Sequence, residues 1–282
     1  AERTARQRTR EAPVISVVAC VKNRAENVRK WITSISGQTC SEILEIVLVD
    51  FSSTDNLKEV LDSAPRQVNL VSVGVQKEPT GFPEAFLKNV GIRRSRGDIV
   101  ICTNVDVVYE PTFFWNIASR CAPGVLVQAV RKNVPEGVAA NTNGTMEPPA
   151  SNYSLVNDFM PETGIPLVAG ADCQAMTKQF WEMFRGYDEE LFGWGALDSD
   201  LTCRALLWGM TLNIVGHSIA CYLHDFHPSD VKKQFLDANR NHPIIMGKIN
   251  CGTICRNPRS WGGIVDGVEI PALTSKREAQ NG

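Results

Sequence analysis

The stretch VISVVAC at residues 14–20 decides the fold, because it is a nearly continuous apolar run rich in β-branched residues. Such a run is typical of a strand that is buried on both faces of a sheet. A segment with helical spacing of its apolar residues follows at 26–35, and a second buried strand, EIVLV, follows at 45–49. Strands and helices that alternate across short turns predict an α/β protein whose mostly parallel central sheet is flanked by helices.

The same alternation continues along the chain and then weakens. Further strands are expected at 68–73 and 98–103, and further helices at 55–61 and 83–94. Ser53 or Thr54 is the expected cap of the helix at 55–61. In the second half we expect strands at 125–130 and 167–176, strands or extended segments at 211–215 and 218–224, helices at 178–184 and 198–208, and a long loop rich in Pro, Gly, Asn and Glu at 133–166.

These patterns predict one domain with two flanking segments. Residues 1–12 form a flexible basic arm and residues 249–282 a C-terminal tail. Residues 13–248 form the single domain, which divides into a nucleotide-binding half at 13–110 and an acceptor or catalytic half at 111–248.

The composition excludes several classes of protein. The chain has 282 residues and a net charge of −2, so no global basic field indicates a nucleic-acid partner. No apolar run approaches the roughly 20 residues that a transmembrane segment needs, and no secretory leader is visible. The nine cysteines are an odd number, and several lie in apolar runs, which is typical of reduced core cysteines. We therefore expect a cytoplasmic protein.

Ligands of a doubly wound sheet bind where the strands end, and three polar stretches follow predicted strands. Lys22 and Arg24, after the first strand, are suited to phosphates, although a solvated turn explains them equally well. Asp50 and the hydroxyls after it are suited to a base or ribose, or simply to helix capping. Asp106 closes a very apolar strand and is suited to a divalent cation that bridges phosphates; the alternative is a strand-ending turn.

The stretch LFGWGALDSDL at residues 191–201 is the fourth candidate. It places Trp194 between two glycines and adds Asp198 and Asp200 at the start of a helical period. One of these acids is a possible N-cap, and residues two apart on a helix do not face the same way, so we expect different roles for them. Further on, His224 and His227 make up half of the four histidines, and a strand-end histidine is a candidate metal ligand.

Taken together, these stretches resemble the GT-A glycosyltransferases. SVVACVKNRAENVRKWITSI, EIVLVDFSSTDN and FPEAFLKNVGIRRSRGDIVICTNVD resemble the opening, the acidic loop and the Asp-x-Asp metal motif of glycosyltransferase family 2. GYDEELFGWGALDSDLTCRALLWGM resembles the Trp-Gly-Gly-Glu-Asp region shared by β-1,4-galactosyltransferases, polypeptide GalNAc-transferases and chondroitin-type polymerases. The resemblance covers about residues 13–227 and implies a GT-A fold.

The resemblance assigns donor-binding residues. Val21, Lys22 and Arg24 match the nucleotide-contacting turn. The second acid of the usual pair after strand two is Phe51 here, so either Asp50 recognises the base or Phe51 stacks on it. Asn104 stands where the metal motif has its first acid, and it is assigned to the nucleotide as well.

The resemblance also assigns metal, catalytic and sugar-binding residues. Asp106 and His224 match the ligands of Mn²⁺ or Mg²⁺, and Cys221 falls where galactosyltransferases place a methionine ligand. Asp198 matches the catalytic base, although the Glu that usually precedes it is Leu197. Trp194 and Gly195 match a mobile loop that closes over the donor sugar. Asp200 is assigned to the acceptor or to support of its helix.

The implied activity is inverting, metal-dependent transfer of a hexose or N-acetylhexosamine from a nucleotide sugar to a hydroxyl of a carbohydrate or glycoconjugate. UDP-galactose, UDP-N-acetylhexosamine and UDP-glucose all fit as donors. Three alternatives are a catalytically impaired nucleotide-sugar-binding module, a sugar nucleotidyltransferase and a retaining transferase. The nucleotidyltransferase is disfavoured because no Gly-rich phosphate loop follows the first strand.

Overall fold

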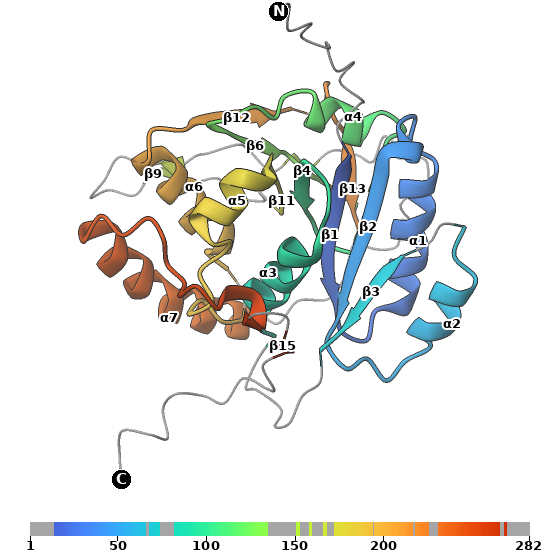
Figure 1. The fold of residues 1–282 in the computed structure, drawn as a ribbon, viewed down its shortest axis with the longest axis horizontal. Coiled ribbons are helices and arrows are strands. Elements are labelled where there is room, and N and C mark those ends of the chain that lie inside the picture. Colours follow the sequence, from blue (N-terminus) through green and yellow to red (C-terminus); the bar gives the residue numbers. More distant parts are fainter. Residues whose placement is uncertain are drawn as a thin grey trace, which may run out of the picture.

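A seven-stranded sheet forms the centre of the molecule (Figure 1). The computed structural model describes residues 14–65, 68–73, 82–134, 151–152, 158–159, 166–167, 172–193, 195–216, 218–225, 231–265 and 268–269. In sheet order the strands are β12 (Thr211–Val215), β6 (Val125–Ala129), β11 (Cys173–Thr177), β4 (Ile99–Cys102), β1 (Ile15–Val21), β2 (Leu44–Asp50) and β3 (Asn69–Ser72). All neighbours are parallel except β11, which is antiparallel to both β4 and β6. The predicted α/β class and mostly parallel sheet are confirmed.

Helices cover both faces of this sheet. The helices α1 (Ala25–Ser36), α2 (Leu57–Asp62) and α4 (Phe113–Ala118) lie on one face. The helices α3 (Glu84–Arg94), α5 (Lys178–Phe184), α6 (Leu197–Leu207) and α7 (Val231–Asn250) lie on the other. Successive residues of β1 alternate between the two cores: Val17 packs on the α1 side and Val18 on the α3 side. None of the helices in the described ranges is long and apolar enough to cross a membrane.

A small second sheet joins the carboxyl end of β4 to the second half of the chain. Its strands are β5 (Val107–Tyr109), β13 (Tyr222–His224), β7 (Lys132–Asn133) and β8 (Ser151–Asn152). The strands β13 and β5 are antiparallel, with His224 opposite Val107. The remaining elements are η1 (Ser41–Ile43), β9 (Asp158–Phe159), β10 (Pro166–Leu167), η2 (Trp261–Gly263), β14 (Ile264–Val265) and β15 (Val268–Glu269).

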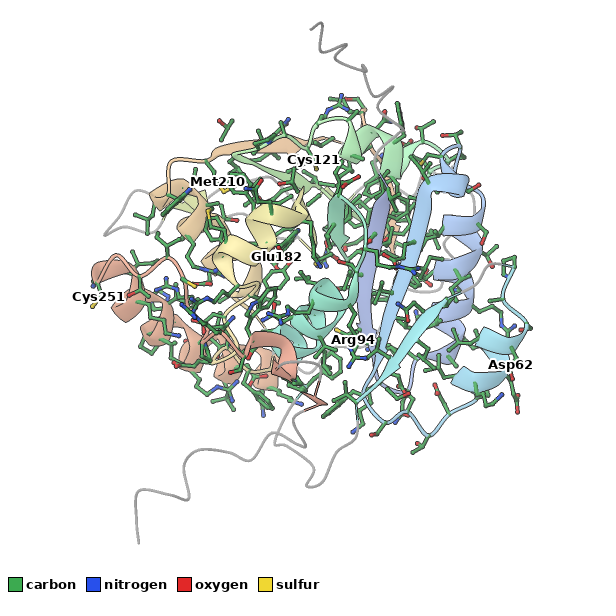
Figure 2. The ribbon with its side chains drawn as sticks, viewed as in Figure 1. Asp62, Arg94, Cys121, Glu182, Met210 and Cys251 are labelled. Atoms are coloured by element: carbon green, nitrogen blue, oxygen red, sulfur yellow. The ribbon has the colours of Figure 1, made fainter. Side chains whose placement is uncertain are left out.

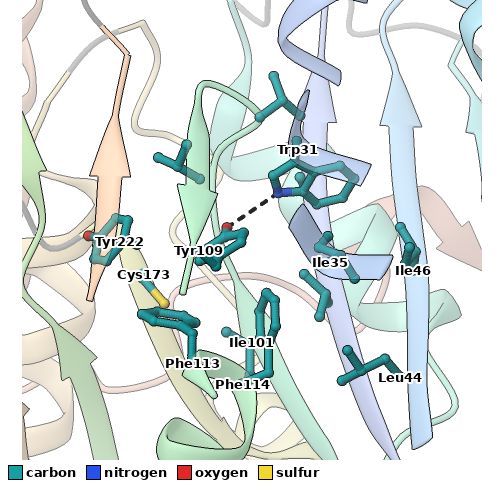
Figure 3. Close-up of a cluster of buried hydrophobic side chains, with 14 of the residues drawn as sticks. Trp31, Ile35, Leu44, Ile46, Ile101, Tyr109, Phe113, Phe114, Cys173 and Tyr222 are labelled. Carbon is teal, nitrogen blue, oxygen red and sulfur yellow. Dashed lines mark hydrogen bonds between the residues drawn. The ribbon is translucent and has the colours of Figure 1, made fainter. Parts of the chain in front are cut away.

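An aromatic cluster fixes the small sheet against α1 (Figure 3). The ring of Tyr109 lies 4.7 Å from that of Phe113 and 4.6 Å from that of Phe114, measured between centroids. Trp31 is fully buried, and its Nε1 donates to the Tyr109 hydroxyl at 3.3 Å. Buried aromatic rings contribute strongly to stability, so the small sheet is held firmly where it leaves the main one.

Several local predictions need correction. The N-cap of α2 is Asn56, without a side-chain capping bond, so neither Ser53 nor Thr54 caps this helix. None of the expected helices lies beyond residue 208, yet α7 spans Val231–Asn250 and continues through Pro243. Within the predicted tail, the Trp261 side chain is 3% exposed and lies under Arg93, whose guanidinium is 5.0 Å from the ring centroid. The predicted arm at 1–12 and most of the predicted loop at 133–166 lie outside the described residues.

A close approach of α3 to the sheet depends on Gly91. A Cβ atom at this position would lie 2.4 Å from Cγ1 of Val18 and 3.2 Å from Cγ2 of Val49. The helix therefore packs directly on β1 and β2, with no room for a methyl group between them.

We predict that Gly91→Ala destabilises the protein by about 1–3 kcal/mol, because overpacking outweighs the gain in helix propensity. Gly247→Ala in α7 is the matched control, since no atom lies within 4 Å of the added Cβ. It should stabilise the protein by up to about 1 kcal/mol. Urea unfolding of both variants measures the difference. A similar gain in both would contradict the close approach of α3.

Candidate active site

The loops after β1 and β2 are joined to each other by hydrogen bonds. The backbone N–H of Asn23 donates to Ser53 Oγ at 2.9 Å, and that of Thr54 donates to Asn23 Oδ1 at 2.7 Å. Asp55 Oδ2 accepts from the backbone N–H of Ala25, the first residue of α1, at 2.8 Å. The hydroxyls that the sequence offered as helix caps therefore bind the neighbouring loop and fix the geometry of the sheet edge.

The side chains assigned to the nucleotide behave differently from one another. Lys22 Nζ lies 5.1 Å from the ring centroid of Phe51, which is 3% exposed and contacts Phe82 edge-on. Val21 is buried in the core, and its carbonyl accepts from the N–H of Phe51. Asp50 is half-buried and accepts from the N–H of Ser53 at 3.1 Å. The nucleotide base could be recognised by Asp50 or stack on Phe51, and of these two side chains the half-buried Asp50 is the accessible one.

The two predicted metal ligands lie together where the main and small sheets meet. His224 Nε2 is 3.6 Å from Asp106 Oδ2, and Arg24 Nη1 approaches the same oxygen at 4.0 Å. The N–H of Asp225 donates to the carbonyl of Asp106, which holds the ends of β13 and β5 together. The Asp225 carboxylate pairs with Lys30 at 2.6 Å.

A carboxylate beside an imidazole is a donor set that fits Mn²⁺, and the oxygen of Asp106 also suits Mg²⁺. Within the described residues no group of three or more His, Cys, Asp or Glu side chains gathers to hold a metal, so ligand oxygens would complete the shell. Cys221 lies immediately before β13 and three residues before His224, roughly 10 Å away along the extended chain, which separates it from the pair. His227 lies outside the described residues.

A buried lysine lies beneath the Asn104 loop. The Lys88 side chain is 1% exposed, and its Nζ lies 2.7 Å from Glu84 Oε1 one turn earlier on α3. The same ammonium group donates to Asn104 Oδ1 at 3.1 Å. Its pairing with Glu84 compensates for much of the cost of burial.

Asp198 lies in the first turn of α6, near Lys88. The N-cap of this helix is Ala196, in the left-handed conformation (φ 71°), so neither Asp198 nor Asp200 is the cap. Gln174 Nε2 and Thr202 Oγ1 both donate to the Asp198 carbonyl, at 3.1 and 2.8 Å. The backbone is thus held from two elements, while the carboxylate has no hydrogen bond to a described residue.

Burial raises the pKa of Asp198 to about 7. The positive charge of Lys88 opposes this shift, and the negative charges of Glu84 and Asp172 add to it. Asp172 itself pairs with Arg131 at 3.0 Å and accepts from the Tyr222 hydroxyl. Lys88 thus interacts electrostatically with Asp198 and also donates to Asn104, two residues before Asp106.

Asp200 lies on the opposite side of α6 from this site. Its side chain is wholly buried, 2.7 Å from Arg204 Nε and 3.3 Å from Arg256 Nη2. We therefore reassign Asp200 from acceptor binding to support of α6, the other role considered for it.

The glycines around Trp194 hold backbone conformations that other residues adopt poorly. Gly193 has φ 77° and Gly195 has φ 89°. The fully buried Asn241 of α7 donates through Nδ2 to the carbonyls of Phe192 and Gly195, at 3.3 and 3.1 Å. The loop is thus fastened to α7 on both sides of Trp194, which itself lies outside the described residues.

Residues 16–157 match the profile of glycosyl transferase family 2. The chain belongs to this family. Residues 156–228 also match the profile described as the N-terminal domain of galactosyltransferase. The two matches meet in the segment that separates β8 from β9.

Curated relatives of this family 2 chain are glycosyltransferases. Validoxylamine A glucosyltransferase from Streptomyces hygroscopicus subsp. jinggangensis is 22% identical over 278 residues, which cover 86% of this chain and 64% of that protein. Glycosyltransferase GlyG from Streptococcus pneumoniae is 38% identical over 98 residues, 34% of this chain and 32% of that protein. The chain spans 64% and 59% of the two validoxylamine A glucosyltransferases that it matches.

Solved structures with the same fold include two that hold nucleotides and Mn²⁺. The mannosyltransferase PcManGT from Pyrobaculum calidifontis, in complex with GDP-Man and Mn²⁺, has a TM-score of 0.52 at 17% identity, covering 79% of this chain and 59% of that one. GalNAc-T7 with UDP, GalNAc and Mn²⁺ has a TM-score of 0.59 at 15% identity, covering 83% and 48%. At these identities the likeness concerns the fold alone, and the predicted GT-A fold is confirmed.

Sequence reasoning missed Lys88 and Asn241. The spacing of Glu84 and Lys88 in FPEAFLKNVG was a usable signal, because residues four apart on a helix pair with each other. Asn241 gave no signal, since its partners are backbone carbonyls far away in the sequence.

The raised pKa of Asp198 predicts a pH-dependent loss of stability. The folded protein retains a proton that the unfolded chain releases above about pH 3.8, so this stabilisation is complete below that pH and disappears as pH rises through about 7. We expect Asp198→Asn, measured by urea unfolding, to become progressively more stable relative to the parent between about pH 4 and pH 7. A constant difference over this range would contradict the burial of the carboxyl group.

Proposed function

We propose that this family 2 chain is an inverting, metal-dependent glycosyltransferase that moves a hexose or N-acetylhexosamine from a nucleotide sugar to a hydroxyl acceptor. The observation that carries the proposal is Asp198, a carboxyl group with a pKa of about 7, coupled through Lys88 to the loop that presents Asp106. A base is most effective when its pKa lies near the working pH.

The donor site is formed by the loops after β1, β2 and β4. Lys22 and Arg24 offer cations to the diphosphate, and Asp50 offers a carboxylate to the base. Structural neighbours hold UDP or GDP-Man, which supports a uridine or guanosine diphosphate sugar as the donor, and we favour a UDP sugar. The nine free cysteines suit a reducing compartment, on which we base a cytoplasmic location.

Asp106 and His224 would hold Mn²⁺ or Mg²⁺ together with oxygens of the donor. When bound, the cation neutralises the charge that develops on the leaving diphosphate. Arg24, 4.0 Å from Asp106, adds a positive charge at the same point. Asp225 lies beside this site, where its carboxylate pairs with Lys30 at 2.6 Å.

Asp198 takes the proton from the acceptor hydroxyl as its oxygen attacks the anomeric carbon. The bond to the leaving diphosphate breaks, and the transition state resembles an oxocarbenium ion. Hydrogen bonds to the Asp198 carbonyl limit the movement of this residue, and a catalytic base must be held in the correct orientation toward its substrate. Trp194 and Gly195 are proposed to contact the sugar.

A second candidate function is a nucleotide-sugar-binding module with impaired chemistry. Two departures from the family pattern favour it: Asn104 replaces an acid, and Leu197 occupies the position before the base and packs in the core with 7% exposure. Slow hydrolysis of the donor in the presence of Mn²⁺ distinguishes the two, because a module without chemistry leaves the donor intact.

We predict that Asp198→Asn lowers turnover about 100- to 10,000-fold while donor binding survives, because only proton transfer is removed. Asp98→Asn is the matched control, since Asp98 is exposed at the amino end of β4, at the opposite edge of the sheet. Steady-state kinetics and nucleotide titration separate the two effects. A near-normal rate for Asp198→Asn would remove this residue from the base role.

We predict that excess chelator abolishes transfer and that added Mn²⁺ restores it. Asp106→Ala and His224→Ala should each raise the Mn²⁺ concentration needed for half-maximal activity, because each removes one ligand. Activity measured across a Mn²⁺ titration tests this directly. Full activity in chelator would contradict the metal requirement while leaving the role of Asp198 intact.

A further inference from the structure

The Lys88 ammonium group determines how the Asn104 side chain can lie. Lys88 is buried, its Nζ is held at 2.7 Å by Glu84, and it reaches Asn104 at 3.1 Å. An ammonium group has three donors and no acceptor, so only the oxygen of a carboxamide can face it. The orientation of the Asn104 amide is therefore dictated by charge.

The amino group of Asn104 is left on the other side of the amide. Asn104 is half-buried, and its Nδ2 makes no hydrogen bond to a residue in the described ranges. It follows β4 at the carboxyl edge of the sheet, two residues before Asp106. A donor with two hydrogens thus remains available in the loop that the proposed function assigns to the nucleotide.

We infer that Lys88 is a positioning residue that turns Asn104 into a hydrogen-bond donor for an oxygen atom of the bound nucleoside diphosphate. The inference rests on the proposed function and specifies how this chain departs from the acidic pattern of its family. The recognised group is an oxygen acceptor, supplied either by a ribose hydroxyl or by the diphosphate.

The charges of the site explain why an amide serves here. Glu84 and Lys88 neutralise each other, and Asn104 is neutral, so this part of the loop adds no negative charge beside a diphosphate. A carboxylate in its place would accept from Lys88, offer no donor and repel the phosphates. Nucleotide binding by this chain is consequently less dependent on a cation than binding by an acidic variant.

The first test measures by calorimetry how tightly the parent protein binds UDP and GDP, with and without Mn²⁺. The nucleotide that binds more tightly is then used for the variants. Asn104→Ala should weaken binding about tenfold, the effect of losing one hydrogen bond. Asn104→Asp should weaken it at least as much in chelator and recover with Mn²⁺. Three analogues then locate the oxygen that accepts from Asn104: the 2′-deoxy and 3′-deoxy nucleotides each lack one ribose hydroxyl, and the free nucleoside lacks the diphosphate. Asn104→Ala should no longer weaken binding of the analogue that lacks the accepting oxygen.

The second test concerns Lys88. The double variant Glu84→Gln/Lys88→Met removes both partners of the ion pair together. It should weaken nucleotide binding as much as Asn104→Ala does, and adding Asn104→Ala to it should cause little further loss. The single variant Lys88→Arg keeps a cation that only donates hydrogen bonds, so it should retain most of the parent's affinity for the nucleotide. Lys58→Met/Asp62→Asn, in an exposed pair with the same spacing on α2, is the control and should bind like the parent.

The outcomes separate the inference from the proposed function. If the parent protein binds neither nucleotide, the proposed function fails and the inference fails with it. If the parent binds but Asn104→Ala and Asn104→Asp bind equally well, the donor role of Asn104 is overturned while the function stands. If the losses from Asn104→Ala and Glu84→Gln/Lys88→Met add fully, Lys88 acts only on general stability and its positioning role is overturned.

Discussion

The buried ammonium group of Lys88 is the constraint on which the arrangement of the site depends. A charge enclosed by protein is stable only if opposite charges and acceptors surround it, and Glu84, Asn104 and Asp198 supply them from three different segments. Its depth follows from Gly91, three residues later and on the same face of α3, where the helix contacts β1 without an intervening side chain. The close packing of this helix thus sets the electrostatics of the candidate site.

The candidate metal pair depends on a different feature, the passage of the chain from one sheet to another. After β4 the backbone leaves the main sheet and enters β5, and Asp106 lies at this junction. His224 reaches it because β13 pairs with β5 in a register that places His224 opposite Val107. The aromatic cluster around Tyr109 secures β5 on the side of α1, so the distance between the two ligands is set by packing remote from them.

The sequence was sufficient for the main strands and insufficient for the short ones. Strands such as β1 are buried on both faces, which produces apolar runs that can be recognised without any partner. A three-residue strand such as β5 is too short to show a period, and α7 was obscured because its sequence contains Pro243. Candidate site residues such as Asp198 and Asp106 were assigned by motif, whereas Lys88 was overlooked because Glu–Lys pairs one helical turn apart normally lie on the surface. Lys88 is instead an interior residue, 1% exposed, on the helix α3 that packs on the central sheet (Figure 2).

The separation of the two acids in LFGWGALDSDL follows from helix geometry. Residues two apart point about 200° away from each other, so when one faces the carboxyl edge the other faces the interior. Asp200 takes the interior position, where Arg204 and Arg256 enclose it, and Arg256 comes from the segment that follows α7. Because a helix rotates as a rigid body, this buried ion cluster fixes the rotation of α6 and therefore the direction of Asp198. The structural acid sets the direction in which the candidate catalytic one points.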